Sequence, residues 1–336
     1  MNSGPTLAIE AIDLVKKFGD NTAVDGVSFA VPEGAVLGLL GPNGAGKTTI
    51  VRMLTTLSIP TSGTGRVAGH DIRTDPAAVR MAMGLTGQAA TVDELLTGRE
   101  NIFLIGRLYG LPKKSLPGLA DLLLEQFSLT EAGNRVAKTY SGGMRRRLDL
   151  AVSLVSAPRI LFLDEPTTGL DPRSRQELWE VLRGLVREGS TLLLTTQYLE
   201  EADQLADEII VIDHGRVIAA GTPTQLKDQA GKASVVVTVS DPAELEQAAE
   251  LLRSHVTEVH VERESRRLSA PASGLADMTR IAGVFAASDI AVDDLGLQRP
   301  SLDDVFLHLT GRRAEEDLAD PSSGPNADTD TEGALR

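Results

Sequence analysis

Gly41-Pro42-Asn43-Gly44-Ala45-Gly46-Lys47-Thr48-Thr49 is the stretch that decides the fold of this chain. It matches the pattern G-x-x-x-x-G-K-[ST], in which successive backbone N–H groups surround the phosphates of a nucleotide. An apolar run at residues 35–40 predicts a buried strand before the loop, and residues 47–57 predict a helix whose N-terminus faces the phosphates. We expect Lys47 to reach the β- and γ-phosphates and the Thr48 hydroxyl to ligate Mg²⁺. The stretch therefore predicts a site for a nucleoside triphosphate.

The segments around this loop indicate an α/β sheet. Three further apolar runs predict strands at residues 160–163, 192–195 and 209–212. Helical patterns lie between them, so we expect a largely parallel sheet. Residues 7–14 and 25–31 predict a small antiparallel element before the loop, and Asp213-His214-Gly215 predicts a hairpin turn.

The chain is expected to contain more than one domain. Residues 5–228 form the predicted α/β unit, and a mostly helical subdomain at about 97–155 is inserted in it. Residues 233–312 predict the order βαββαβ of a small ferredoxin-like α+β domain, followed by a helix at 301–309. Residues 313–336 are acidic and poor in apolar side chains, so we expect a disordered tail.

Composition limits the classes of function. The 336 residues include no cysteine, which excludes disulfides, thiolate metal sites and cysteine nucleophiles. The first residues carry Glu10 and Asp13 and lack a long apolar core, so no signal peptide is expected, and no apolar run approaches the length of a membrane span. The net charge of −14 disfavours general nucleic-acid binding. Any work at a membrane would need another chain to supply the spanning part.

Two acids end the apolar run at 160–163. Asp164 is placed to hold Mg²⁺, directly or through water, and Glu165 is placed to polarise the attacking water. Paired acids at a strand end are often only a turn or a helix cap. Because the carboxyl ends of parallel strands form the ligand-binding edge of such a sheet, the phosphate loop favours the catalytic interpretation here.

The segment Tyr140-Ser141-Gly142-Gly143-Met144-Arg145-Arg146-Arg147-Leu148 predicts a helix that begins with a good N-cap, Ser141. At this point the chain resembles the ATP-binding subunits of ABC transporters, whose signature S-G-G-[QM]-x-[QR]-R also lies just before the Asp-Glu strand. The resemblance implies that Ser141, Gly142 and Gly143 reach the γ-phosphate in a second copy, so that ATP is enclosed in a head-to-tail homodimer. It also implies an ABC ATPase cassette of the P-loop NTPase fold.

The resemblance assigns four further residues. Gln88 matches the glutamine that contacts Mg²⁺ or water and senses γ-phosphate, and Asp171, in Gly169-Leu170-Asp171-Pro172, matches a residue at the dimer interface. Phe18 matches the aromatic residue that stacks on adenine. Gln197 stands where the family usually has a histidine that contacts γ-phosphate. Glutamine can still bridge phosphate and backbone but cannot become cationic, so hydrolysis is expected to continue at an altered rate.

Two longer strings narrow the subfamily. Residues 195–203, TTQYLEEAD, and residues 302–311, LDDVFLHLTG, are similar to those of bacterial drug exporters of the daunorubicin/doxorubicin-resistance type. The resemblance implies an ATPase that uses ATP and Mg²⁺ and no other metal. It would bind a separate integral-membrane permease at the cytoplasmic face of the plasma membrane and export drugs or secondary metabolites. The domain at 233–312 would serve dimerisation and stability, or regulation.

Two other functions are considered. A soluble ABC ATPase acting on ribosomes or DNA usually carries two cassettes, long coiled-coil arms or basic patches, whereas this chain has one phosphate loop and an acidic balance. A module that binds ATP without turnover is disfavoured by Glu165. The transported substrate would contact the membrane subunit, so the sequence does not identify it.

Overall fold

The computed structural model describes residues 6–87, 92–231 and 233–310. The described chain divides into two compact units, one up to Pro223 and one from Thr224 onward. The expected tail at 313–336 and the predicted site residue Gln88 lie outside the described residues. Among the helices that are described, none has the length and apolar character needed to cross a membrane.

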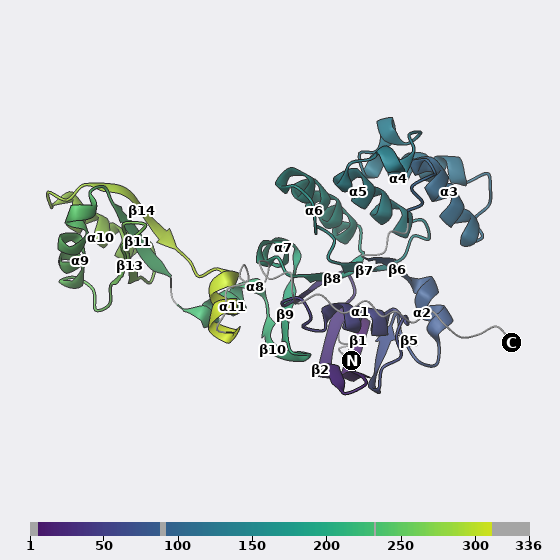
Figure 1. The fold of residues 1–336 in the computed structure, drawn as a ribbon, viewed down its shortest axis with the longest axis horizontal. Coiled ribbons are helices and arrows are strands. Elements are labelled where there is room, and N and C mark those ends of the chain that lie inside the picture. Colours follow the sequence, from purple (N-terminus) through teal and green to yellow (C-terminus); the bar gives the residue numbers. More distant parts are fainter. Residues whose placement is uncertain (1–5, 88–91, 232, 311–336) are drawn as a thin grey trace. The chain divides into compact units, whose positions relative to one another are not determined.

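A six-stranded sheet forms the centre of the first unit (Figure 1). Its order is β10-β9-β3-β8-β7-β6, and all neighbours are parallel except the β9–β10 hairpin. The strands are β3 Val36–Leu40, β6 Met83–Thr86, β7 Ile160–Asp164, β8 Thr191–Thr196, β9 Glu208–Asp213 and β10 Arg216–Gly221. Every residue of β3, β7 and β8 is buried, which explains their continuous apolar runs. The prediction of a largely parallel sheet is thus confirmed, while β6 was not predicted.

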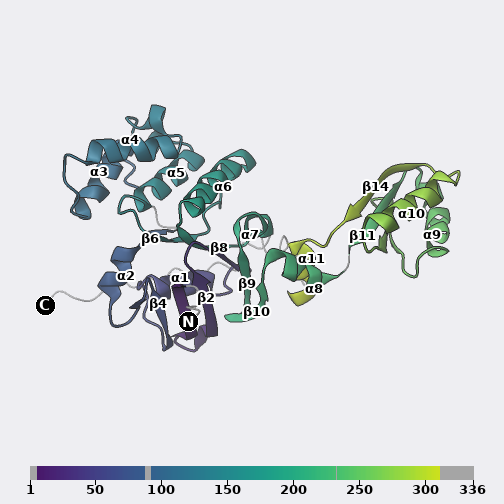
Figure 2. The same cartoon turned by 180° about the vertical axis from the view of Figure 1, so that it is seen from behind.

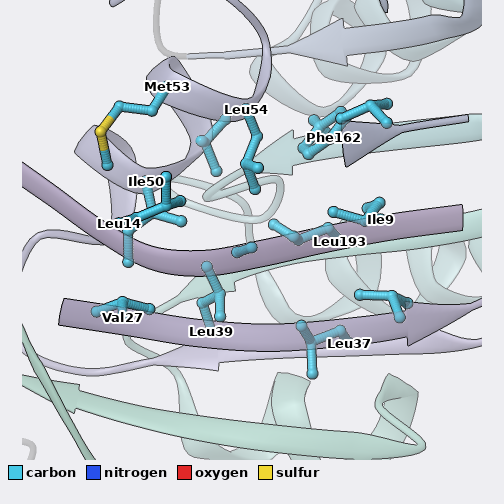
Figure 3. Packing of buried hydrophobic residues seen from close by; sticks show 14 of the residues in the cluster. Ile9, Leu14, Val27, Leu37, Leu39, Ile50, Met53, Leu54, Phe162 and Leu193 are labelled. Atoms are coloured by element: carbon cyan, nitrogen blue, oxygen red, sulfur yellow. The ribbon is translucent and has the colours of Figure 1, made fainter. Parts of the chain in front are cut away.

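A second, antiparallel sheet precedes and follows the phosphate loop in sequence. Its order is β2-β1-β4-β5, built from β1 Leu7–Phe18, β2 Asn21–Pro32, β4 Ser62–Val67 and β5 His70–Asp71. Figure 3 shows how helix α1 (Lys47–Leu54) places Ile50, Met53 and Leu54 against this sheet and the central one. Ile9, Leu14 and Val27 from the antiparallel sheet and Leu39 and Phe162 from the central sheet are fully buried in the same cluster. This packing fixes the direction of the first turn of α1.

The inserted helical region covers the other side of the central sheet, opposite to β1, β2 and α1 (Figures 1 and 2). Its elements are α3 Gly98–Leu108, α4 Leu116–Gln126, short 3-10 turns at Thr130–Ala132 and Ala137–Thr139, and α5 Gly142–Ser153. Thr97 and Glu100 form a capping box that fixes the start of α3. The remaining helices of this unit are α2 Pro76–Ala82, α6 Pro172–Arg187 and α7 Leu199–Leu205.

The second unit contains a four-stranded antiparallel sheet of order β12-β13-β11-β14. Its elements are α8 Pro223–Ala230, β11 Ser234–Val239, a 3-10 turn at Pro242–Glu244, α9 Leu245–Arg253, β12 His260–Glu262, β13 Arg267–Pro271, α10 Leu275–Ala286, β14 Val292–Gln298 and α11 Leu302–Thr310. The alternating burial of β11 faces Val235, Val237 and Val239 into a core shared with Leu252 and Phe285. From β11 to β14 the elements follow the predicted order βαββαβ, so the expected α+β fold is confirmed.

Candidate active site

The phosphate loop lies between β3 and α1 and is packed tightly against its neighbours. A side chain at Gly41 would clash with the Ile212 carbonyl, and Gly46 has a φ of +108° with its Cβ position 2.5 Å from the Ala23 carbonyl oxygen. Only glycine satisfies both demands. The Gly215 N–H donates to the Ala45 carbonyl at 2.9 Å, which further fixes the loop. Residues 41–49 are therefore held in one conformation by β2, β9 and the hairpin.

Lys47 is the cation of this loop and is almost fully buried, with 4% of its side chain exposed. Its Nζ donates to the carbonyls of Gly41 at 2.7 Å and Pro42 at 3.0 Å and lies 4.0 Å from Glu165 Oε1. Burial lowers the pKa of Lys47, while the charges of Glu165 and Asp164 act in the opposite direction. A desolvated ammonium group held this way interacts strongly with an anion placed beside the loop.

Asp164 ends β7 and meets the first turn of α1. Its Oδ1 accepts hydrogen bonds from the hydroxyls of Thr48 at 3.1 Å and Thr195 at 2.5 Å, and the residue is 5% exposed. The fold thus brings together two oxygen donors, Thr48 and Asp164, that lie 116 positions apart in the sequence. Carboxylate and hydroxyl oxygens are the ligands that Mg²⁺ takes in nucleotide sites, so this pair fits the ion.

Glu165 directly follows β7 in a left-handed conformation, with φ +48°. Its N–H donates to both the carbonyl and the hydroxyl oxygen of Thr195, each at 3.1 Å. Thr168 donates to Glu165 Oε2 at 3.1 Å, and 9% of the Glu165 side chain is exposed. A non-glycine residue held at positive φ is strained, and its surroundings must hold it there. Here they hold the carboxylate next to Lys47 and at the edge of solvent.

A cavity of about 320 Å³ opens in front of Glu165. It is lined by Asp164, Glu165 and Thr168 from the region after β7 and by Gly142 and Arg145 from the start of α5, among others. The cavity lets water reach the Glu165 carboxylate from the side of α5.

Ser141 caps α5, as predicted, with its Oγ accepting the Met144 N–H at 3.2 Å. Ser141 and Gly142 are exposed, and a Cβ at Gly142 would meet no atom within 4 Å, whereas the Cβ position of Gly143 is 2.7 Å from the Ser174 hydroxyl. The start of α5 therefore presents a polar, unobstructed helix N-terminus to solvent.

Three other predicted site residues lie at the ends of elements. Asp171 caps α6, because its carboxylate accepts the Ser174 hydroxyl at 2.6 Å and the Ser174 N–H at 3.0 Å, and these bonds lower the pKa of Asp171. Gln197 lies between β8 and α7 and is half-buried. Phe18 ends β1 with 53% of its surface exposed, and Lys16 Nζ lies 4.9 Å from its ring centre.

A buried acid stabilises the element after Gln197. Glu201 on α7 is fully buried, and Oε1 accepts the indole N–H of Trp179 on α6 at 3.4 Å. Burial raises the pKa of Glu201, while the nearby polar groups of Thr196, Thr167 and Trp179 and the charge of Arg175 act in the opposite direction. The Trp179–Glu201 hydrogen bond joins α6, which follows Asp171, to α7, which follows Gln197.

Two residues that contact the strand end were not predicted. Thr195 is the register partner of Asp164 on the neighbouring parallel strand, and it bonds both Asp164 and the Glu165 N–H. The signal was present, because the apolar run of β8 ends in two threonines beside a strand that ends in two acids. Arg146 on α5 donates to the carbonyls of Asp164, Glu165 and Pro166. No local pattern in the sequence indicated that contact.

Known proteins share both the sequence and this architecture. The profile of the ABC transporter family matches residues 24–168. The daunorubicin resistance ATP-binding protein DrrA2 of Streptomyces coeruleorubidus is 51% identical over 310 residues, 92% of this chain and 96% of the relative. The Nod factor export ATP-binding protein I of Ralstonia nicotianae is 40% identical over 323 residues, 94% of this chain and 97% of the relative.

Solved structures resemble the first unit. The ATP-binding cassette of an ABC transporter crystallised in its ADP conformation aligns with a TM-score of 0.59 at 26% identity, covering 66% of this chain and 92% of that one. The ATP-binding subunit of another ABC transporter aligns with a TM-score of 0.60 at 28% identity, covering 67% and 93%. Since the relatives match over nearly their whole length and the phosphate loop meets the acids of β7 as in a nucleotide site, the chain belongs to the ABC transporter family, as an ATP-hydrolysing subunit of the daunorubicin/doxorubicin-resistance group.

Proposed function

We propose that this chain drives the export of drugs or secondary metabolites by hydrolysing ATP in a homodimer bound to a separate membrane permease. The observation that supports this most is the meeting of Lys47, Thr48, Asp164 and Glu165 at one edge of the central sheet. We assign this chemistry to a domain at 5–228, and an accessory role in dimerisation or regulation to a domain at 233–312.

Within one copy, the loop N–H groups and Lys47 bind the β- and γ-phosphates, and Phe18 offers an exposed aromatic face to adenine. Thr48 and Asp164, with Gln88, would hold Mg²⁺, which neutralises charge on the phosphate oxygens. Glu165 accepts a hydrogen bond from the attacking water and orients it in line with the γ-phosphate. Lys47 Nζ, 4.0 Å from Glu165 Oε1, attracts that carboxylate and helps to hold it beside the phosphate loop.

A second copy is proposed because one copy leaves the exposed Ser141 and Gly142 without an anion to bind. A helix N-terminus favours a phosphate, and the resemblance supports the γ-phosphate bound by the second copy as that anion. Asp171 would lie at the same interface, and Gln197 would contact the γ-phosphate of its own copy. Two identical interfaces then close with two-fold symmetry.

The relatives support export as the coupled process. Some relatives are named for daunorubicin or doxorubicin resistance and others for Nod factor export, and these names support export as the process that ATP hydrolysis drives. The permease would be bound by the helical subdomain at about 97–155, at the cytoplasmic face of the plasma membrane. Closure of the dimer around ATP would then change the access of the permease to its substrate.

The test is made on the full chain with and without its permease. With Mg²⁺ and ATP, the Glu165→Gln variant should sediment as a dimer that retains two nucleotides. In cells, co-expression with the permease should raise drug resistance only when Glu165 is intact. Co-sedimentation with ribosomes, with no gain in resistance, would instead support the soluble alternative. A chain that stays monomeric with trapped ATP would refute the homodimer.

A further inference from the structure

Arg146 makes an unusual set of contacts from the second turn of α5. Its Nε donates to the Pro166 carbonyl at 2.8 Å, and its Nη2 donates to the carbonyls of Asp164 at 3.0 Å and Glu165 at 3.1 Å. Its Nη1 donates to the carbonyl of Gly87, the residue after β6, at 2.9 Å and to Asp149 at 3.4 Å. One guanidinium therefore joins α5 to the ends of both β6 and β7.

These contacts use the full hydrogen-bonding capacity of the side chain. Arginine has five N–H donors, and Arg146 makes five bonds, four of them to backbone carbonyls. Only 16% of the side chain is exposed. Burial lowers the pKa of Arg146, and the charges of Asp149, Glu201, Asp164 and Glu165 act against that, so the group stays cationic. Its donors are already occupied by protein oxygens, so Arg146 is not a phosphate ligand.

The neighbouring arginines of α5 point elsewhere. Arg145 pairs with Glu94 at 2.8 Å, and Arg147 pairs with Glu177 at 3.4 Å and donates to the Phe127 carbonyl at 3.3 Å. Successive residues of a helix are about 100° apart, so only the middle one of three faces the strand ends. Arg147 is as buried as Arg146, with 14% of its side chain exposed. It is therefore a matched control on the same helix.

The carbonyls that Arg146 holds belong to the backbone that carries the proposed base. Three successive carbonyls, those of residues 164–166, converge on one cation where the chain turns through the left-handed Glu165. Without a donor, these oxygens would repel one another and remain unpaired in a largely buried place. The backbone of Glu165 would then leave its strained conformation, and the carboxylate would move away from its contacts with Thr168 and Lys47.

We propose that Arg146 is a positioning residue for ATP hydrolysis, which fixes the Glu165 carboxylate relative to the start of α5. Ser141 and Gly142, at the N-terminus of the same helix, face the nucleotide of the second copy in the proposed dimer. A helix joined by three hydrogen bonds to residues 164–166 and by one to Gly87 links engagement of that nucleotide to the placement of the base in the first copy. This inference rests on the proposed function, because it requires Glu165 to orient the attacking water.

The test compares Arg146→Lys and Arg146→Gln with Arg147→Lys in the full chain. We expect Arg146→Lys to lower kcat for MgATP at least about tenfold, because the compact ammonium group of lysine cannot span four carbonyls. KM and the ATP affinity measured without Mg²⁺ should stay within about twofold of the parent chain, as the phosphate loop is not touched. Arg146→Gln should lose more turnover than Arg146→Lys, and Arg147→Lys should keep kcat within about twofold.

A double variant identifies the residue through which Arg146 acts. In a Glu165→Gln chain, adding Arg146→Lys should lower the residual turnover no further, because the group to be positioned is already missing. A further tenfold loss there would overturn the proposal, as would normal kcat in Arg146→Lys. A parallel loss of ATP affinity and turnover in Arg146→Lys would assign Arg146 to the fold alone and would also overturn it.

The same set separates this inference from the function on which it rests. If Glu165→Gln keeps full turnover, the proposed role of Glu165 fails whatever Arg146 does. If Glu165→Gln loses turnover while Arg146→Lys does not, only the role of Arg146 is wrong.

Discussion

The two compact units of this chain bury different kinds of side chain. Among the described residues, the buried polar and charged ones all belong to the first unit, including Lys47, Asp164, Thr195 and Glu201, and most of them lie near the ends of parallel strands. The core of the second unit consists of apolar side chains such as Val237, Leu252 and Phe285. Burying polar groups costs free energy unless they are paired, so a fold retains them where they have a task. This difference agrees with the proposed chemistry in the first unit, and the core of the second unit is held by apolar packing.

Removal of the proposed base, Glu165, is the strongest test of this difference between the two units. Glu165→Gln keeps the shape and loses the negative charge, so we expect turnover to fall about 10²- to 10⁴-fold with ATP affinity retained. Steady-state ATPase and equilibrium nucleotide binding measure the two effects. Glu180→Gln, at an exposed site on α6, should leave both unchanged. Normal turnover in Glu165→Gln would show that the buried polar residues of the first unit do not mark a catalytic site.

A core truncation tests the second unit. Leu252 is fully buried, so Leu252→Ala should destabilise this unit by about 2–5 kcal/mol, the range found for such cavities. Denaturant unfolding followed by hydrogen exchange reports each unit separately. Leu275→Ala, 72% exposed on α10, should change stability by less than about 0.5 kcal/mol. If Leu252→Ala weakens ATP binding as much as it destabilises the second unit, the two units are not energetically separate.

Removal of the loop cation should weaken the binding of ATP. Lys47→Ala removes a buried ammonium group with charge-assisted contacts, so ATP affinity should fall about 10- to 100-fold. Isothermal titration measures it directly. Arg52→Ala, exposed in the last turn of α1, is the matched control and should bind ATP normally. Unchanged affinity in Lys47→Ala would mean that residues 41–49 do not hold the phosphates.

The smallest effect concerns a buried acid with no proposed catalytic role. Because burial raises the pKa of Glu201 above 4.5, the folded state binds its proton more tightly than the unfolded chain does. The stability from this group is complete below the unfolded pKa and is lost as pH rises toward the folded pKa. The Tm of Glu201→Gln relative to the parent chain should therefore increase from about pH 4 to about pH 8.

Glu200→Gln is the control for this pH series. The Glu200 side chain is 66% exposed one position away, so Glu200→Gln should change the Tm less than Glu201→Gln does over the same range. A constant difference in Glu201→Gln would show that burial does not govern its titration.

Local patterns in the sequence account for much of the fold. The apolar runs at 160–163 and 192–195 each specify a buried strand, and both strands were predicted with nearly the observed bounds. The short edge strand Met83–Thr86 was missed, because four residues carry little periodic signal. Arg146 was missed for a different reason. Four of its five partners are backbone carbonyls that lie 18 to 59 positions away in the sequence, and carbonyls leave no residue pattern to detect.

The contact between Trp179 and Glu201 has a practical consequence. Trp179 is the only tryptophan of the chain, and it lies buried on α6, which Asp171 caps, in contact with Glu201 on α7, which follows Gln197. Its intrinsic fluorescence therefore reports on the two helices next to Asp171 and Gln197. Changes around these helices on addition of nucleotide can be measured in the unlabelled protein.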